Sequence, residues 1–493
     1  MWDCDDMQQT FLWHDYETFG LSPAKDRPAQ FAAVRTDDQM NPIGEAMCWY
    51  CRPSMDYLPN PQSIQITGIL PQACEEKGVT EAQFARRINA EMSKENTISI
   101  GYNSMRFDDE VSRFMFWRNF QDVYGREWKD GCGRYDLFPL VLATWALRPE
   151  GINWPMNEEG KVSFKLENIS KANGLTHEHA HDALSDVYAT IGLAKLIKTK
   201  QPRLWDYAFA NRTKKDVTKL LEAAKNTTPL LWVSMFFGAK NGFMKLVAPL
   251  ATHPTQPNTV LMWDLAYDPK LLLELTPEEV QARLFVSDED REHGVERLPI
   301  YLCKINQAPF LVHKLGVLRD ERAAQFGLDK HQAMKHFEEL QQMLEPLMGL
   351  WAEALGEEKD FERQPIDEAL YGEGFATYND QRKIQWIGRQ SGEALANLVQ
   401  SGRAVFDNER LATMLFRYRA RNWPETLTPE ESQEWRAYCH ARLMEGADGA
   451  LTLEAFAEAI EAMADVEEMD ERTEELCGAL YDWCERVSNA LDD

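Results

Sequence analysis

The chain has 493 residues, of which 44% are hydrophobic, and a formal net charge of −27. This length exceeds that of one ordinary domain, and the composition is globular, which excludes disordered and fibrous proteins. The start is acidic and lacks the basic segment of a signal peptide, and no run of about 18 apolar residues follows. We therefore expect a cytoplasmic protein that does not enter a membrane.

The negative charge is unevenly distributed along the chain. Residues 201–250 carry a net charge of +5, whereas residues 356–493 carry −17. A polyanion responds to the local electrostatic field rather than to the total charge. A basic groove for nucleic acid is therefore compatible with this acidic chain.

The first predicted element is a strand over residues 10–18, TFLWHDYET, in which apolar residues are frequent. A side-chain period of two places Asp15 and Glu17 on the same face of such a strand. Carboxylates this close repel each other unless a positive charge lies between them, and divalent cations prefer oxygen ligands. The pair predicts a metal site, with a solvent-exposed strand end as the alternative.

The remainder of residues 1–200 alternates strand-like and helical segments. QFAAVRTD and AMCWYCRP predict a meander, ISIGYNS a further strand and DEVSRFMFWRNF a helix. ALSDVYATIGLAKLIKTK has apolar residues at helical spacing, and Gln201-Pro202 after it marks a domain boundary. This order predicts an α/β domain with a mixed sheet.

The chain changes character twice after this boundary. Short β-rich runs separated by Gly, Asn and Pro between residues 229 and 265 predict a small barrel or sandwich. After about residue 315 the pattern is helical, with a capping box at Thr428-Pro429-Glu430-Glu431 and an acidic amphipathic end over residues 451–493.

Two further segments supply acids that could join Asp15 and Glu17. Asp108, in NSMRFD, follows a predicted strand at the start of a helix, and Asp186, in HDALSD, lies about one turn inside another helix. His181 precedes Asp186 by five positions and is a candidate general base. Four carboxylates and one histidine suit two divalent cations that also bind water and a substrate oxygen.

Neighbouring residues offer alternatives to this set. Spacing alone does not exclude Asp109, Glu110 or Asp182, and Asp182 would also serve as a helix N-cap. His177 and His179 form HEHAH with His181, which suggests a histidine metal site. We interpret these two as residues of a solvated loop, because only His181 has the four-residue spacing to Asp186.

The three segments Asp15-x-Glu17, Asn103-x3-Phe107-Asp108 and His181-x4-Asp186 resemble the motifs of the DEDDh 3′–5′ exonuclease superfamily, in their usual order. Beyond them, DYETFG, DRPAQFAA, LRPEGINWP, SFKLENISKANG, AHDALSDVYATI and LFRYRARNWPETL resemble the bacterial exonuclease I family. The resemblance covers nearly the whole chain, firmly over residues 10–250 and 411–427. It is faintest in the acidic end.

The resemblance implies a fold, a reaction and cofactors. The expected domains are a ribonuclease H-like α/β exonuclease domain (1–200), a Src-homology-3-like β-barrel with a helical extension (201–355) and a helical C-terminal domain (356–493). They would wrap single-stranded DNA and remove nucleoside 5′-monophosphates processively from its 3′ end. Asp15, Glu17, Asp108 and Asp186 would bind two Mg²⁺, for which Mn²⁺ could substitute, and His181 would accept the proton of the attacking water.

The resemblance also implies contacts with substrate and partner. DNA contacts are expected from Glu17, Arg113, Tyr124 and Trp128, from Lys165 near the scissile phosphate, and from Lys214 in the cluster Arg212, Lys214 and Lys215. Arg417, Arg419 and Arg421 would line the same DNA path or tie the helical domain by ion pairs. The C-terminal tail of single-stranded-DNA-binding protein would bind Arg148, Tyr207 and the basic residues of 314–322.

Two other functions compete with this interpretation. One is the same chemistry on RNA or as a proofreading subunit, but the roughly 290 residues beyond the catalytic domain count against it. The other is a binding module without catalysis, which the complete set of acids and His181 disfavours. The protein is expected to act as a monomer.

Overall fold

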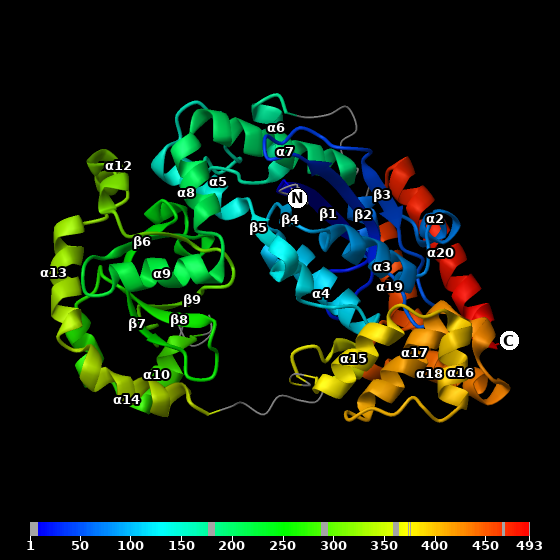
Figure 1. The fold of residues 1–493 in the computed structure, drawn as a ribbon. Helices are drawn as coiled ribbons and strands as arrows, with labels where there is room; N and C mark the ends of the chain where they lie inside the picture. The colour runs from blue at the N-terminus through cyan, green and yellow to red at the C-terminus, as the bar shows by residue number, and fades with distance from the viewer. Residues whose placement is uncertain are drawn as a thin grey trace, which may run out of the picture. The chain divides into compact units, whose positions relative to one another are not determined.

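The structure is a computed structural model that describes residues 8–175, 183–286, 294–357, 364–372, 374, 376–465 and 469–492 (Figure 1). The chain divides into two compact units, and each is described by itself. Unit 1 comprises residues 1–134, 177–188 and 361–493, and unit 2 comprises residues 135–176 and 189–360. Among the described residues, no helix combines the length and the apolarity that crossing a membrane requires.

The first sheet is mixed and has its central strand in the segment that carries the acid pair. β1 is antiparallel to β2 and parallel to β4, and the sheet order is β3-β2-β1-β4-β5. The strands are β1 (Thr10–Thr18), β2 (Pro28–Thr36), β3 (Met47–Tyr50), β4 (Thr97–Gly101) and β5 (Gly133–Asp136). The predicted meander and mixed sheet are confirmed.

Two helices pack against one face of this sheet. α3 (Glu81–Met92) and α4 (Asp108–Arg118) bury their apolar side chains in one cluster with Leu12, Tyr16 and Phe31 of the sheet. Leu12 and Tyr16 are even-numbered residues of β1, so Asp15 and Glu17 belong to the opposite set of side chains. The period of two thus separates the packed face of β1 from the face that bears the acids.

Further helices surround the strands of the two units. The short helices of unit 1 are α1 (Pro61–Thr67) and α2 (Pro71–Lys77). Those that follow β5 are α5 (Phe138–Leu147), α6 (Leu166–Ala172), α7 (Ala183–Lys200), α8 (Pro202–Ala210) and α9 (Lys214–Ala224). α7 ends directly before Gln201-Pro202, as the sequence predicts.

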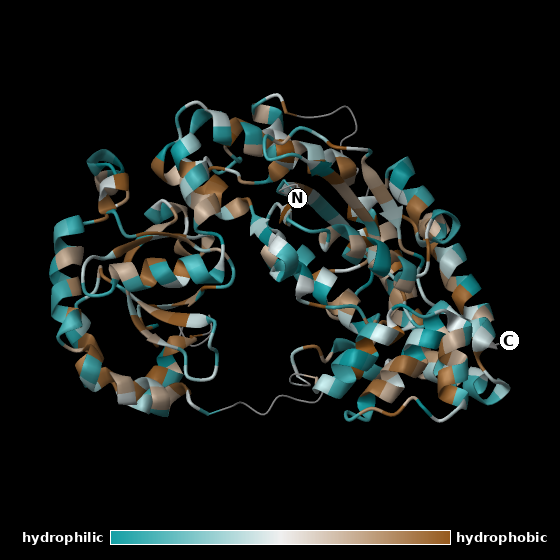
Figure 2. Cartoon of the chain, viewed as in Figure 1, coloured by the Kyte–Doolittle hydropathy of each residue, from teal (hydrophilic) through white to brown (hydrophobic). Residues whose placement is uncertain are grey.

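The second sheet, in unit 2, is antiparallel throughout, with the order β10-β6-β7-β8-β9. Its strands are β6 (Leu230–Val233), β7 (Met244–Thr252), β8 (Thr259–Asp264), β9 (Ile300–Lys304) and β10 (Phe310–Val312). They are largely hydrophobic (Figure 2) and share a core with α9. One sheet of five strands fits the predicted small barrel, and the sandwich alternative is wrong.

Helices account for most of the chain after β10. Those of unit 2 are α12 (Asp320–Gln325), α13 (Lys330–Gln341) and α14 (Leu344–Leu355), while α10 (Pro277–Leu284) precedes β9. Those of unit 1 are α15 (Tyr378–Ile387), α16 (Gly392–Gln400), α17 (Arg410–Asn422), α18 (Pro429–Glu445), α19 (Leu453–Ala464) and α20 (Glu471–Asp492). The predicted capping box of Thr428 and Glu431 begins α18.

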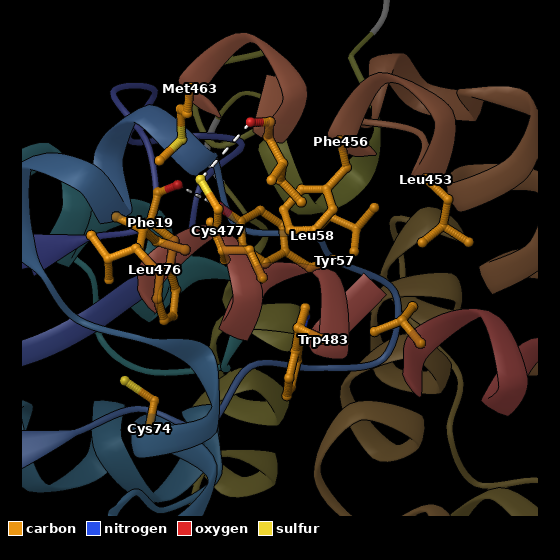
Figure 3. Close-up of a cluster of buried hydrophobic side chains, with 14 of the residues drawn as sticks. Phe19, Tyr57, Leu58, Cys74, Leu453, Phe456, Met463, Leu476, Cys477 and Trp483 are labelled. Carbon is orange, nitrogen blue, oxygen red and sulfur yellow. Dashed lines mark hydrogen bonds between the residues drawn. The ribbon is translucent and has the colours of Figure 1, made fainter. Parts of the chain in front are cut away.

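The acidic C-terminal helices are part of the core of unit 1. Leu453 and Phe456 of α19 and Trp483 of α20 lie in one buried cluster with Tyr57 and Leu58 (Figure 3). Cys477, also in this cluster, donates a hydrogen bond from Sγ to the carbonyl of Ile460. Full burial of a large apolar side chain contributes about 1.5–3 kcal/mol. The acidic residues of this region therefore lie on helices that are anchored by their apolar faces.

A buried ion pair connects the same two regions, and further ion pairs lie beside it within the C-terminal region. Nη2 of Arg421 lies 2.8 Å from Oδ2 of Asp56, and its Nη1 lies 2.9 Å from Oδ1 of Asp367. Asp367 also pairs with Arg417 at 2.7 Å. Nη1 of Arg419 lies 2.6 Å from Oε1 of Glu431. The pair of Arg421 with Asp56 thus ties the helical domain to the exonuclease domain, whereas the pairs of Arg417 and Arg419 lie within the helical domain.

Candidate active site

Asp15, Glu17 and Asp186 form a cluster of carboxylates in unit 1. Each offers one oxygen, and these oxygens lie within 4.8 Å of one another. Asp15 and Glu17 come from the central strand β1, and Asp186 comes from the first turn of α7. The predicted convergence of two distant segments is thus observed, and three oxygens at this separation can share a divalent cation.

Asp108 lies beside this cluster rather than within it. It is the first residue of α4 and is 5% exposed. The backbone N–H of Tyr16 donates a hydrogen bond of 3.1 Å to its Oδ1, which holds the carboxylate against β1 next to Asp15. This position suits binding to a cation through a water molecule.

The electrostatics of the cluster favour a cation. Burial raises the pKa of Asp15 well above its ordinary value, and the charges of Asp108, Glu17 and Asp186 raise it further. Charged carboxylates in a buried site repel each other, and bound divalent cations remove that repulsion. The donor set consists of oxygens only, which fits Mg²⁺ or Mn²⁺.

The proposed general base lies outside the described residues. His181, the alternative acid Asp182, and His177 and His179 all belong to residues 176–182. The role of His181 therefore stays a prediction that rests on its spacing from Asp186.

Two alternative acids on α4 have other partners. Asp109 is 2% exposed and pairs with Nη2 of Arg126 at 2.6 Å and with Nη1 of Arg134 at 2.8 Å. Although its burial acts in the opposite direction, these two arginines lower the pKa of Asp109. Glu110 pairs with Nη1 of Arg113 at 2.6 Å. Both acids therefore stabilise the surroundings of the site.

The predicted DNA contacts in unit 1 differ in exposure. Arg113 is 7% exposed, and its guanidinium also bonds Glu127, with Nε 2.8 Å from Oε1, and faces the ring of Tyr124 at 5.5 Å. In the structure it therefore supports Tyr124, and its contact with DNA stays a prediction. Trp128 is 67% exposed and has Lys129 over its ring at 5.5 Å, so its face is accessible to a base.

The other predicted DNA contacts belong to unit 2. Lys165 is exposed at the N-cap of α6, and Lys214 and Lys215 are exposed at the start of α9. Arg212 instead packs over the ring of Phe209 at 3.9 Å and donates to its carbonyl at 2.7 Å. The lysines remain predicted phosphate contacts, whereas Arg212 is occupied within its own unit.

The central strand of this mixed sheet presents two acids to a third in the first turn of α7, an arrangement typical of a metal-dependent exonuclease domain. The family described as "Exonuclease" matches residues 12–194. The families "Exonuclease I SH3-like domain" and "Exonuclease I C-terminal domain" match residues 212–356 and 364–487.

Relatives match along most of the chain. Exodeoxyribonuclease I of Escherichia coli is 44% identical over 87% of this chain and 88% of the relative. That of Haemophilus influenzae is 42% identical over 89% of this chain and 91% of the relative. The chain belongs to the exodeoxyribonuclease I family and is an exonuclease with three domains.

Solved structures of this family share the fold. E. coli exonuclease I in complex with a dA16 oligonucleotide has a TM-score of 0.89, with 40% identity over 97% of this chain and 100% of that one. A zinc-bound E. coli exonuclease I–ssDNA complex has a TM-score of 0.89 with 39% identity over 98% and 100%. An SSB/exonuclease I structure in complex with inhibitor CFAM has a TM-score of 0.86, with 38% identity over 98% and 100%.

Proposed function

We propose that this chain removes nucleoside 5′-monophosphates processively from the 3′ end of single-stranded DNA, using two Mg²⁺. The observation that carries the proposal is the oxygen cluster of Asp15, Glu17 and Asp186. Membership of the exodeoxyribonuclease I family and the DNA bound by its solved relatives support this substrate.

The residues of the site have different roles in hydrolysis. Asp15, Glu17 and Asp186 would hold the cations, and Asp108 would assist them through a water molecule. When bound, the cations lower the pKa of water and stabilise the charge on the leaving oxygen. His181 accepts the proton of the attacking water, for which an imidazole with an ordinary pKa of about 6.5 is suited. Trp128 and Tyr124 offer rings on which bases can stack.

An assay on 3′-labelled substrates tests this function. We expect rapid release of labelled mononucleotide from single-stranded DNA with Mg²⁺, and no release when EDTA removes the metal. Duplex DNA and single-stranded RNA of the same sequence serve as matched controls and should react more slowly. Preferential cleavage of RNA would instead favour the RNA exonuclease alternative.

Unit 2 contains a pocket that fits the predicted partner. Its volume is about 580 Å³, and Leu204, Phe310 and Val312 form its buried apolar floor. Its basic lining residues are Arg148, Arg203, Lys314 and Arg319. An apolar floor with a cationic rim is complementary to an acidic, hydrophobic peptide that ends in a carboxylate.

The two predicted partner residues occupy the same pocket. The hydroxyl of Tyr207 donates to the carbonyl of Leu311 at 2.7 Å, and Nη1 of Arg148 donates to the carbonyl of Val317 at 2.9 Å. Arg322, also within the predicted range 314–322, is not among the residues that line the pocket and bonds the carbonyls of Trp145 and Ala146. We propose that the pocket binds the C-terminal tail of single-stranded-DNA-binding protein, with Arg148, Lys314 and Arg319 facing its acids.

Arg148→Ala is expected to lower the affinity for a labelled tail peptide at least about 10-fold, since the variant lacks a cation that faces the acids of the peptide. Fluorescence anisotropy measures the affinity. Lys304→Ala, which removes an exposed cation of unit 2 outside the pocket lining, is the control and should bind normally. Both variants should degrade free oligonucleotides at the wild-type rate. Equal peptide affinity for Arg148→Ala and wild type would contradict the assignment.

A further inference from the structure

A segment of the C-terminal domain is fixed on the catalytic helix α4. Ile366, Ala369 and Leu370 are buried in a cluster that also contains Phe114 and Trp117 of α4. Nε1 of Trp117 donates a hydrogen bond of 2.7 Å to the carbonyl of Ile366. The residue that follows this anchored segment therefore has a defined position on α4.

That residue is Tyr371, and its side chain is held by three contacts. Its hydroxyl donates to Oε2 of Glu110 at 2.6 Å and accepts from Nη1 of Arg113 at 3.2 Å. Its ring meets the ring of Phe114 edge-on, with centroids 5.6 Å apart. Tyr371 nevertheless remains 58% exposed.

The location of Tyr371 connects it with the exonuclease site. Glu110 lies two residues after Asp108 in the first turn of α4. Arg113, which contacts Tyr371, also faces the ring of Tyr124. Two tyrosines, one from each domain, thus contact the guanidinium of Arg113 on the catalytic helix α4.

An exposed aromatic ring with a fixed orientation suits the face of a nucleobase, because stacking requires little ordering of such a side chain. We infer that Tyr371 is a stacking site for a base on the 5′ side of the scissile phosphate, which the C-terminal domain contributes to substrate binding. This inference rests on the proposed function, in which single-stranded DNA is the substrate. Stacking is sequence-tolerant, since every base has a π face.

Two variants of Tyr371 separate the contribution of the ring from that of the hydroxyl, and a third variant is the control. Tyr371→Leu removes the aromatic face and should lower the affinity for single-stranded DNA, measured in EDTA, by about 5- to 140-fold. This range corresponds to the stacking of one base. Tyr371→Phe keeps the ring and should stay within about 2-fold of wild type. Tyr481→Leu, which changes an exposed tyrosine on α20, is the matched control and should bind normally.

A scan with one abasic nucleotide at each position identifies the base concerned. At the position of the stacked base, we expect an abasic nucleotide to weaken DNA binding by wild type but not by Tyr371→Leu. The variant already lacks the ring on which that base stacks. Wild-type affinity for Tyr371→Leu, or an equal loss for Tyr371→Phe and Tyr371→Leu, would overturn the inference. Failure of wild type and Tyr481→Leu to degrade single-stranded DNA would instead overturn the proposed function.

Discussion

Asp15→Asn is expected to lower kcat at least about 10³-fold, because it removes a ligand from the site where cations stabilise several kcal/mol of transition-state charge. Asp186→Asn should act in the same way, and neither change should abolish binding of single-stranded DNA in EDTA. Asp206→Asn, which alters an exposed acid of α8, is the control and should retain full activity. Substantial turnover by either cluster variant would contradict the site.

Asp15→Asn should lower activity, but it should increase the stability of the metal-free protein. The raised pKa of Asp15 means that its contribution to stability is present at low pH and is lost as pH rises through the folded-state pKa. At pH 8 without metal, Asp15→Asn should therefore have a higher Tm than wild type, and the difference should vanish below about pH 4. Mg²⁺ should raise the Tm of wild type more than that of the variant.

His181→Ala is expected to lower kcat by about 10²- to 10⁴-fold, the contribution of a general base. The Mg²⁺ concentration that gives half-maximal activity should change little, since the carboxylates are retained. Wild-type kcat/KM should rise with pH through the imidazole pKa, and the variant should lack this rise. Stopped-flow or quenched assays across pH measure both quantities.

His177→Ala is the matched control for this variant, since His177 belongs to the same HEHAH segment. It should keep the activity and pH profile of wild type. A large loss of Mg²⁺ affinity in His181→Ala would show that His181 is a metal ligand, and similar losses in both variants would favour the histidine metal site.

Local patterns predict the acids of the site because each depends on a short stretch of chain. The alternation in residues 10–18 places Asp15 and Glu17 on one face, and helix starts position Asp108 and Asp186. Local periodicity also predicts the mixed sheet, the helix ending before Pro202 and the capping box of α18.

Contacts between residues far apart in the chain cannot be predicted from local sequence patterns. The resemblance implies that Arg113 contacts DNA, but it does not reveal that Glu127 and Glu110 enclose its guanidinium or that Tyr371 contacts it from 258 residues away. The same limitation applies to Tyr371 itself, which sequence reasoning missed. The sequence shows only an aromatic residue after the apolar pair Ala369-Leu370. This pattern indicates a substrate contact only once the structure shows that the pair packs on α4.

Residues 19–74 are joined to α17–α20 by ion pairing and apolar contacts. These contacts also limit how genes of this family can diverge. Asp56 is fully buried and pairs with Arg421, so loss of that arginine would break the ion pair of a buried carboxylate, at a cost of about 3–5 kcal/mol. Transfer of residues 12–194 alone into another gene would likewise uncover the surface that receives Phe456 and Trp483. Substitutions on one side therefore require compensation on the other, and we expect this catalytic domain to be inherited with its C-terminal helices rather than to spread by domain shuffling.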